Sequence, residues 1–254
     1  MTVSTDALFQ CLLRLGDNTL ILGQRLGEWC GHAPALEEDI ALANTALDLM
    51  GQTRHWLTLA GEVEGKGRSE DDLAMLRDVW DFRNVLLVEQ PNRDYGHTLM
   101  RQFLFDHYHL LMLRGLSESA DSRLGDIAAK SVKEVTYHAE RSAELIIALG
   151  DGTEESHMRM QDALDRLFPF AGELFETDAI DEDLAQHGIA PLPSSLRPAF
   201  EAQLDIVLAE ATLSKPTDSF AHKGGRTGFR HTEHLGHLLA SMQWLQRAYP
   251  GAQW

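Results

Sequence analysis

Breaks rich in glycine and proline divide the chain into long stretches that are compatible with helix. The breaks include Gly65 and Gly67, "EQPN", "LGDG", "GIAPLPSS" and "HKGGRTG". No sustained period-two alternation is present, and no Asn-Gly or Asp-Gly lies between alternating runs. The pattern predicts an all-α protein with helices at about residues 5–29, 35–63, 94–116, 121–149, 153–175, 195–213 and 230–248.

Most of these stretches exceed the usual helix length of about 11–12 residues, which suits an up-and-down helical bundle with additional C-terminal helices. The segment "SEDDLAMLRDVWDFRNVLL" predicts shorter helices between the second and third long ones. It opens with Ser69 and Asp72 at the spacing of a capping box. No internal repeat or long linker divides the chain, so we expect residues 1–254 to form a single domain.

The balance of charge excludes several classes of partner. Acidic residues outnumber basic ones 39 to 22, giving a net charge of -17. Such a surface repels phosphate backbones and anionic lipid. No apolar run approaches the ~20 residues of a membrane span, and "MTVSTDALFQ" is no signal peptide, so we expect a cytoplasmic protein. Cys11 and Cys30 fit no zinc or redox motif and are expected to be buried free thiols.

Three of the long stretches place an acidic residue among apolar positions. Glu134 lies beside the stripe of residues 121–149, and Asp106 interrupts the stripe of residues 94–116. In residues 35–63 the predicted core face carries Ile40, Asn44, Leu47, Asp48 and Gly51. A buried carboxylate is costly unless it is paired or bound to metal, so each of these acids needs a partner.

The stretch "KSVKEVTYHAER" resembles half of a di-iron site, in which two Glu-x-x-His motifs on separate helices supply ligands. Glu134 and His138 are spaced i, i+4, with Tyr137 at i+3, and both spacings share one helical face. The second half fits poorly, because Asp48 is followed by Gly51 and Gln52 at these positions. His55 lies seven residues on, about 10 Å along the axis.

The candidate ligand set therefore lacks a histidine and has short carboxylates. Its positions are Asp48, Gly51, Asp106, Glu134 and His138, and residues 5–29 add only Asp17, Gln24 and Glu28 with no favourite. The favoured interpretation is a bundle core whose polar residues pair with each other and with neighbours, Arg54 or Lys133 neutralising a carboxylate. The alternatives are a mononuclear or adventitious metal, and a di-iron oxygenase that binds iron through Asp48, Asp106, Glu134 and His138. A ferritin-type storage protein is disfavoured by the same shortage of metal ligands.

Two later motifs have both a functional and a structural interpretation. His231, His234 and His237 could bind zinc, but successive i+3 steps drift around a helix, so structural or interface roles are favoured. "HKGGRTG" could receive phosphate at a helix N-terminus, but a connecting loop is favoured. No G-x-S-x-G, P-loop or G-x-G-x-x-G motif is present.

Several long segments resemble one known family. They are "RLGDNTLILGQRLGEWCGHAPALEEDIALANTALDLMGQTR", "LLVEQPN", "KEVTYH", "HTEHLGHLLASMQWLQR" and the tail "PGAQW". They are similar to the C subunits of bacterial phenylacetyl-CoA epoxidases, in the PaaA/PaaC family. The resemblance implies a ferritin-like bundle that pairs with a homologous A subunit, which carries the di-iron centre and binds phenylacetyl-CoA. It implies no cofactor in this chain and a reductase that uses NADPH, FAD and an iron–sulfur cluster. The product that it implies is the ring 1,2-epoxide of the CoA thioester.

The resemblance places the candidate ligand positions where a catalytic relative holds metal ligands, so it implies a non-catalytic partner without catalytic, cofactor-binding or metal-binding residues of its own. We expect a large apolar interface with the A subunit, to which exposed aromatics and leucines of "WDFRNVLLVEQPN" or of the first helix contribute. A homo-oligomer can form when the partner is missing.

Overall fold

The computed structural model describes residues 3–217 and 221–252, so the last two residues of the tail "PGAQW" lie outside the described part. It divides the chain into two compact units, residues 1–89 with 223–254, and residues 90–222. The described residues form ten α-helices and two short 3₁₀ helices, with no strand, which confirms the predicted all-α fold. None of these helices is long and apolar enough to cross a membrane. The single-domain assignment stays a prediction.

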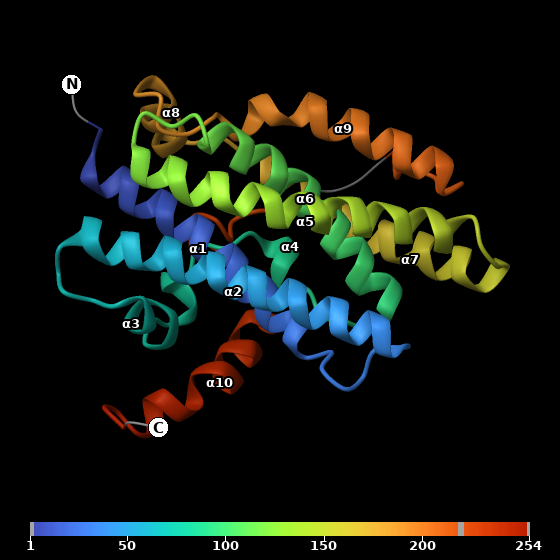
Figure 1. Cartoon of the computed structure of the whole chain (residues 1–254), viewed down its shortest axis with the longest axis horizontal. Helices are drawn as coiled ribbons and strands as arrows, with labels where there is room; N and C mark the ends of the chain where they lie inside the picture. Colours follow the sequence, from blue (N-terminus) through green and yellow to red (C-terminus); the bar gives the residue numbers. More distant parts are fainter. Residues whose placement is uncertain (1–2, 218–220, 253–254) are drawn as a thin grey trace. The chain divides into compact units, whose positions relative to one another are not determined.

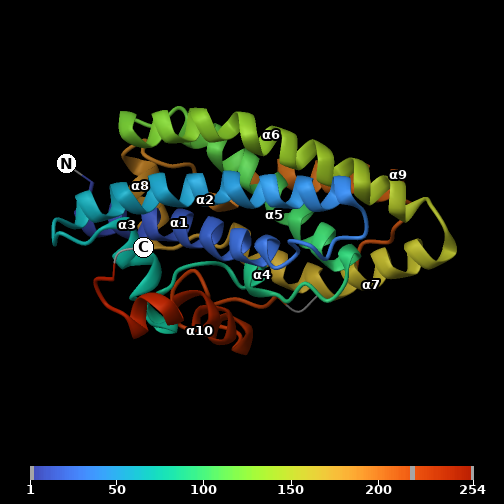
Figure 2. The ribbon, with the colours of Figure 1, turned by 60° about the horizontal axis from the view of Figure 1, so that its bottom comes forward.

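The first unit is built on two long antiparallel helices, α1 (Thr5–Gly27) and α2 (Leu36–Glu64), which lie side by side in Figure 1 and Figure 2. Small residues allow their close approach, since a Cβ added to Gly16 would lie 2.5 Å from Leu57 Cδ2. The hydroxyl groups of Thr19 and Thr53 meet across the contact, with 2.8 Å between their oxygens. The two buried hydroxyl groups therefore satisfy each other's hydrogen bonding within an otherwise apolar contact between the helices.

The predicted core face of α2 is wrong. Ile40 and Leu47 are exposed by 53% and 69%, Asn44 and Gly51 are exposed, and Asp48 is half-buried. The buried face instead carries Leu42, Thr45, Ala46, Leu49, Gln52, Thr53 and Trp56. Both faces of α2 are apolar in sequence, so periodicity alone could not decide which one packs on α1.

Three short helices follow α2, as predicted: α3 (Glu70–Met75), the 3₁₀ helix η1 (Val79–Asp81) and α4 (Leu86–Glu89). The predicted capping box is confirmed, because the Asp72 backbone N–H donates to Ser69 Oγ at 3.1 Å and the Ser69 N–H donates to Asp72 Oδ2 at 2.9 Å. Helix α10 (Glu233–Ala248) packs on α3, and Gln243 Nε2 donates to the carbonyls of Ala74 and Arg77, both at 3.0 Å.

A buried ion pair joins α1 to the segment between α3 and η1. Arg77 Nη1 donates to Asp17 Oδ2 at 2.9 Å, and Arg77 Nη2 donates to Asp17 Oδ1. The Arg83 backbone N–H donates to Asp17 Oδ2 at 2.8 Å, and the Arg77 guanidinium lies 4.4 Å from the centre of the Phe82 ring. Two-point pairing, a backbone donor and an aromatic face together compensate the desolvation of both charges.

The second unit contains α5 (Tyr95–Leu116), α6 (Ser122–Gly150), α7 (Glu154–Ala171), the 3₁₀ helix η2 (Gly172–Phe175), α8 (Ala179–Gln186) and α9 (Pro193–Glu210). Helix α5 packs on α6, α7 and α9. Side-chain caps from Asp94, Asp121 and Thr153 open the three long helices. Helix α8 was not predicted, although Asp178 and Asp181 form a capping box that signals its start.

The prediction of buried cysteines is wrong. Cys30 is exposed and Cys11 is half-buried, and both are free thiols. Cys30 lies just after the C-terminus of α1, where the chain turns over the surface toward α2. The backbone N–H groups of Gly31 and Ala33 in this turn donate to Asp39 Oδ2, so the loop is held by a side chain of α2 and not by burial.

The pair of Asp17 and Arg77 predicts a large effect of a single truncation. Arg77→Ala leaves the Asp17 carboxylate buried without its cation, so we expect a loss of about 3–5 kcal/mol in the free energy of unfolding. Urea denaturation followed by circular dichroism measures it. The control is Arg197→Ala, which removes an exposed i, i+4 partner of Glu201 and should change the midpoint little. Equal midpoint shifts in the two variants would contradict the assignment.

Candidate functional site

Asp106 is the most deeply buried of the candidate ligands, with no exposed surface. It projects from α5 and accepts hydrogen bonds from Gln102 Nε2 at 2.6 Å and from Ser142 Oγ on α6 at 3.3 Å. Burial raises the pKa of Asp106 to about 8, against the opposing effect of these two hydrogen bonds. The carboxyl group is therefore protonated at neutral pH, and its partners are an amide and a hydroxyl.

His109, which was not predicted as a site residue, is buried on the same helix. Burial, with a smaller contribution from His138, lowers the pKa of His109 to about 3, so its imidazole is neutral. Among the described residues its Nδ1 atom has no hydrogen-bond partner. The signal was present in the sequence, because Asp106 and His109 have the i, i+3 spacing of a carboxylate and a histidine.

The remaining candidate ligands differ in place and burial. His138 is buried and Glu134 is half-buried on α6 of the second unit. Asp48 is half-buried and Gly51 is exposed on α2 of the first unit. The part of the chain that the structure describes contains no group of three or more histidines, cysteines, aspartates or glutamates that could hold a metal ion. A di-iron centre needs about four carboxylates and two histidines.

The other acids proposed from the first helix have protein partners. Asp17 is bound by Arg77, and Glu28 accepts from Arg25 Nη1 at 2.9 Å. Gln24 is half-buried. The cation that neutralises a buried carboxylate is therefore Arg77, which was not predicted from the sequence. Of the two cations that were predicted, Arg54 lies 3.5 Å from Glu70 at the surface and Lys133 is exposed.

The histidine cluster near the C-terminus has a structural member. His231 Nδ1 contacts Glu89 Oε1, and its Nε2 lies 3.2 Å from the Phe82 carbonyl oxygen. The buried Glu89 also accepts from the backbone N–H and hydroxyl of Thr232 at 2.8 and 2.7 Å. His231 therefore links the start of α10 to α4, which agrees with the favoured structural role of these histidines. His234 is half-buried and His237 is exposed.

The glycine-rich loop "HKGGRTG" closes on itself. The Gly228 backbone N–H donates to the Gly225 carbonyl at 2.8 Å, and those of Phe229 and Arg230 both donate to the Gly224 carbonyl. Gly225 lies against the Asn84 carbonyl, where an added Cβ would come within 2.4 Å. These backbone donors are used inside the loop, which agrees with the favoured role as a connection.

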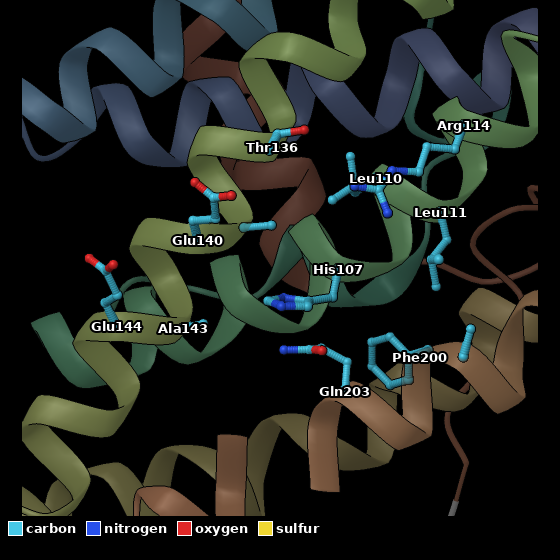
Figure 3. Close-up of a pocket in the computed structure, with 12 residues that line it drawn as sticks. His107, Leu110, Leu111, Arg114, Thr136, Glu140, Ala143, Glu144, Phe200 and Gln203 are labelled. Atoms are coloured by element: carbon cyan, nitrogen blue, oxygen red, sulfur yellow. The ribbon is translucent and has the colours of Figure 1, made fainter. Parts of the chain in front are cut away.

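Figure 3 shows a pocket of about 490 Å³ in the second unit, formed by α5, α6 and α9. Its apolar wall includes Leu110, Leu111 and Phe200, and His107 projects between α5 and α9 toward Gln203. His107 Nδ1 lies 3.0 Å from the Phe103 carbonyl oxygen, and burial lowers the pKa of His107. The pocket was not predicted, because its lining comes from three helices that are distant in sequence.

The pKa of Asp106 predicts a specific pH dependence of stability. An aspartate in an unfolded chain has a pKa of about 3.9. Between that value and about 8 the folded state binds one proton more than the unfolded state, so the free energy of unfolding falls as pH rises through this window. Asp106→Asn removes this titration and keeps donors and acceptors for Gln102 and Ser142.

We therefore expect the free energy of unfolding of Asp106→Asn to rise relative to that of the wild type by a few kcal/mol, in order of magnitude, between pH 4 and pH 8. Urea denaturation at several pH values measures the difference. Asp126→Asn, at an exposed position of α6, is the matched control, and its free energy of unfolding should depend on pH in the same way as that of the wild type. If the free energy of unfolding of Asp106→Asn also follows the wild type at every pH, the Asp106 carboxyl group is ionised in the folded protein.

Comparisons with known proteins agree with the resemblance seen in the sequence. A family model described as "Phenylacetic acid catabolic protein" (PaaA_PaaC) matches residues 1–254. The chain is 50% identical over 242 residues to the C subunit of the 1,2-phenylacetyl-CoA epoxidase of Escherichia coli (strain K12), covering 95% of this chain and 97% of that protein. The chain thus belongs to the PaaA/PaaC family of phenylacetic acid catabolic proteins, whose fold is ferritin-like.

Proposed function

We propose that this chain is the structural, non-catalytic subunit of a cytoplasmic phenylacetyl-CoA 1,2-epoxidase, and that it pairs with and stabilises a homologous di-iron A subunit. The identity of 50% with a protein named as the C subunit of that epoxidase supports the proposal, because it extends over almost the whole of both chains. A relative that is named as a subunit works with other chains, so partnership is part of the same proposal.

The contacts of Asp106 support the non-catalytic part of the proposal. Its two oxygens accept hydrogen bonds from Gln102 on its own helix and from Ser142 on α6, and burial raises the pKa of Asp106 to about 8. Both oxygens of this carboxyl group thus have protein partners between α5 and α6, which supports a role in packing.

The exposed apolar side chains support a partner and favour α2 as part of the interface. Among the apolar residues of "WDFRNVLLVEQPN" only Trp80 is strongly exposed, by 62%, while Phe82 and residues 85–88 are buried. No large apolar residue of α1 is exposed. Helix α2 instead exposes Leu36 by 72%, together with Ile40 and Leu47. These three side chains share one helical face, which is the face that was predicted to be core.

The proposed complex divides its chemistry among chains. The A subunit is expected to bind phenylacetyl-CoA and the two irons, and a reductase with FAD and an iron–sulfur cluster delivers electrons from NADPH. No step of the epoxidation is assigned to a residue of this chain. Its contribution is a folded surface against which the A subunit packs.

Metal analysis tests the non-catalytic role. We expect the purified chain to hold far less than one iron, and Glu134→Ala to retain full epoxidase activity when it is assembled with the A subunit. Elemental analysis and turnover of phenylacetyl-CoA measure the two quantities. Stoichiometric iron with a di-iron spectrum in the isolated chain, or loss of turnover in a folded and assembled Glu134→Ala complex, would establish the oxygenase alternative instead.

A charge placed on the exposed face of α2 tests the partnership. Leu47→Asp should lower the recovery of co-expressed A subunit with this chain at least about tenfold, because a desolvated carboxylate is costly at an interface core. Thr58→Asp adds the same charge at another exposed position of α2 and should have little effect. Recovery and size-exclusion chromatography give the result, and equal recovery with both variants would exclude this face.

A further inference from the structure

Both ring nitrogens of His231 face oxygen atoms that accept hydrogen bonds. Nδ1 contacts Glu89 Oε1, and Nε2 lies 3.2 Å from the carbonyl oxygen of Phe82. A neutral imidazole has one N–H group, so it can donate to only one of these two oxygens. The imidazolium form has two N–H groups and suits this place better than either neutral tautomer.

The surroundings of Glu89 indicate which of the two side chains holds the shared proton. Glu89 is fully buried and accepts from Asn84 Nδ2 at 3.0 Å, and from the backbone N–H and the hydroxyl group of Thr232 at 2.8 and 2.7 Å. Several donors favour the ionised form of a carboxyl group. Since an ionised Glu89 can only accept, the proton between the two side chains belongs to His231.

Burial makes this pair sensitive to the loss of a proton. The side chain of His231 is 1% exposed, and the Trp80 ring lies beside it, with 6.3 Å between the ring centres. Loss of one proton turns a nitrogen lone pair toward the oxygen of Glu89 or of Phe82. It also leaves the Glu89 carboxylate buried without its charged partner, which is strongly destabilising.

Arg25 of α1 is one of two cations close to the pair. It donates to the backbone carbonyl of Glu89 from Nε at 3.2 Å and from Nη2 at 2.8 Å. It also donates to the His234 carbonyl at 3.3 Å and to Glu28 Oε1 at 2.9 Å. The His234 side chain is half-buried, and the neighbouring Glu233 is exposed. The Arg25 guanidinium therefore favours the ionised form of Glu89.

Arg83 is the second cation. Its Nη1 atom donates to the Phe82 carbonyl at 2.8 Å, the same oxygen that His231 Nε2 approaches. Like Arg25, it opposes a positive charge on His231. The contact with Glu89 favours that charge, so the charge of the His231 ring depends on Glu89.

The pair holds one end of the C-terminal helix. Thr232 is the N-cap residue of α10, and both of its donors bind Glu89. The other end is held by Gln243 and Arg247, which donate to backbone carbonyls of residues 74–77. Arg247 also donates to Asp78 Oδ1 at 2.8 Å. The two ends of α10 are thus fixed by separate groups.

We propose that Glu89 and His231 form a buried carboxylate–imidazolium pair, and that this pair is a pH-sensitive latch for the start of α10. The start of the helix is held while His231 carries both protons, and it loosens when alkaline pH removes one of them. Gln243 and Arg247 keep the other end in place. The latch is independent of the proposed function, because it uses none of the candidate ligand positions.

Nitrogen NMR of the histidine side chains tests the charge of the pair. A histidine in an unfolded chain has a pKa of about 6.5, so it is almost entirely neutral at about pH 8. At this pH we expect both ring nitrogens of His231 to be protonated in the folded full chain, and only one in the urea-unfolded chain. His231→Asn identifies the signal. A single proton on His231 in the folded chain at this pH would overturn the proposal.

Hydrogen exchange tests the latch. Glu89→Gln keeps the size of the side chain and removes its charge, so His231 should lose one proton at about pH 8. The protection factors of the backbone amides of residues 235–239 should then fall at least about tenfold, while those of residues 243–247 change little. Glu62→Gln makes the same change of charge at an exposed position of α2 and should alter neither the His231 signal nor the protection.

A pH titration of the wild type gives a second reading that does not depend on how the variant folds. Raising the pH until the NMR signal shows loss of the second proton should cause the same local fall in protection. Unchanged protection of residues 235–239, in Glu89→Gln or in the wild type after His231 has lost this proton, would show that the pair is no latch.

Discussion

The pair of Asp17 and Arg77 is the constraint on which the first unit depends. It places a carboxylate with no exposed surface in the middle of α1, and it is tolerated because Arg77 and the Arg83 backbone bind both of its oxygens. The carbonyl of Arg77 in turn accepts from Gln243 of α10. One buried ion pair therefore links α1, the segment after α3 and the C-terminal helix.

The second unit also contains a buried carboxyl group, but accommodates it in a different way. Burial favours the neutral form of Asp106, whose hydrogen-bond partners among the described residues are an amide and a hydroxyl. In a ferritin-like protein such interior acids commonly serve metal ions. Here one acid is paired with a guanidinium and another keeps its proton. Both arrangements give these interior acids partners within the protein.

Much of the fold followed from the sequence because it depends on local signals. The long helices begin and end within a few residues of the predicted limits, since glycine, proline and capping side chains are local. The buried face of α2 could not be predicted, because both of its faces are apolar and the choice depends on the fit of Leu49 and Trp56 to α1. Likewise Asp106 was recognised as buried, but its partner Ser142 lies 36 residues away.

The exposed apolar face of α2 has a consequence for how the chain behaves in solution. Hydrophobic contact favours self-association through the exposed side chains of Leu36, Ile40 and Leu47. The net charge of -17 opposes this association, because the chains repel one another. That repulsion is screened within about 10 Å at 0.1 M salt and within about 3 Å at 1 M. Self-association of the isolated chain thus depends on ionic strength: low salt favours separate molecules, and high salt favours association.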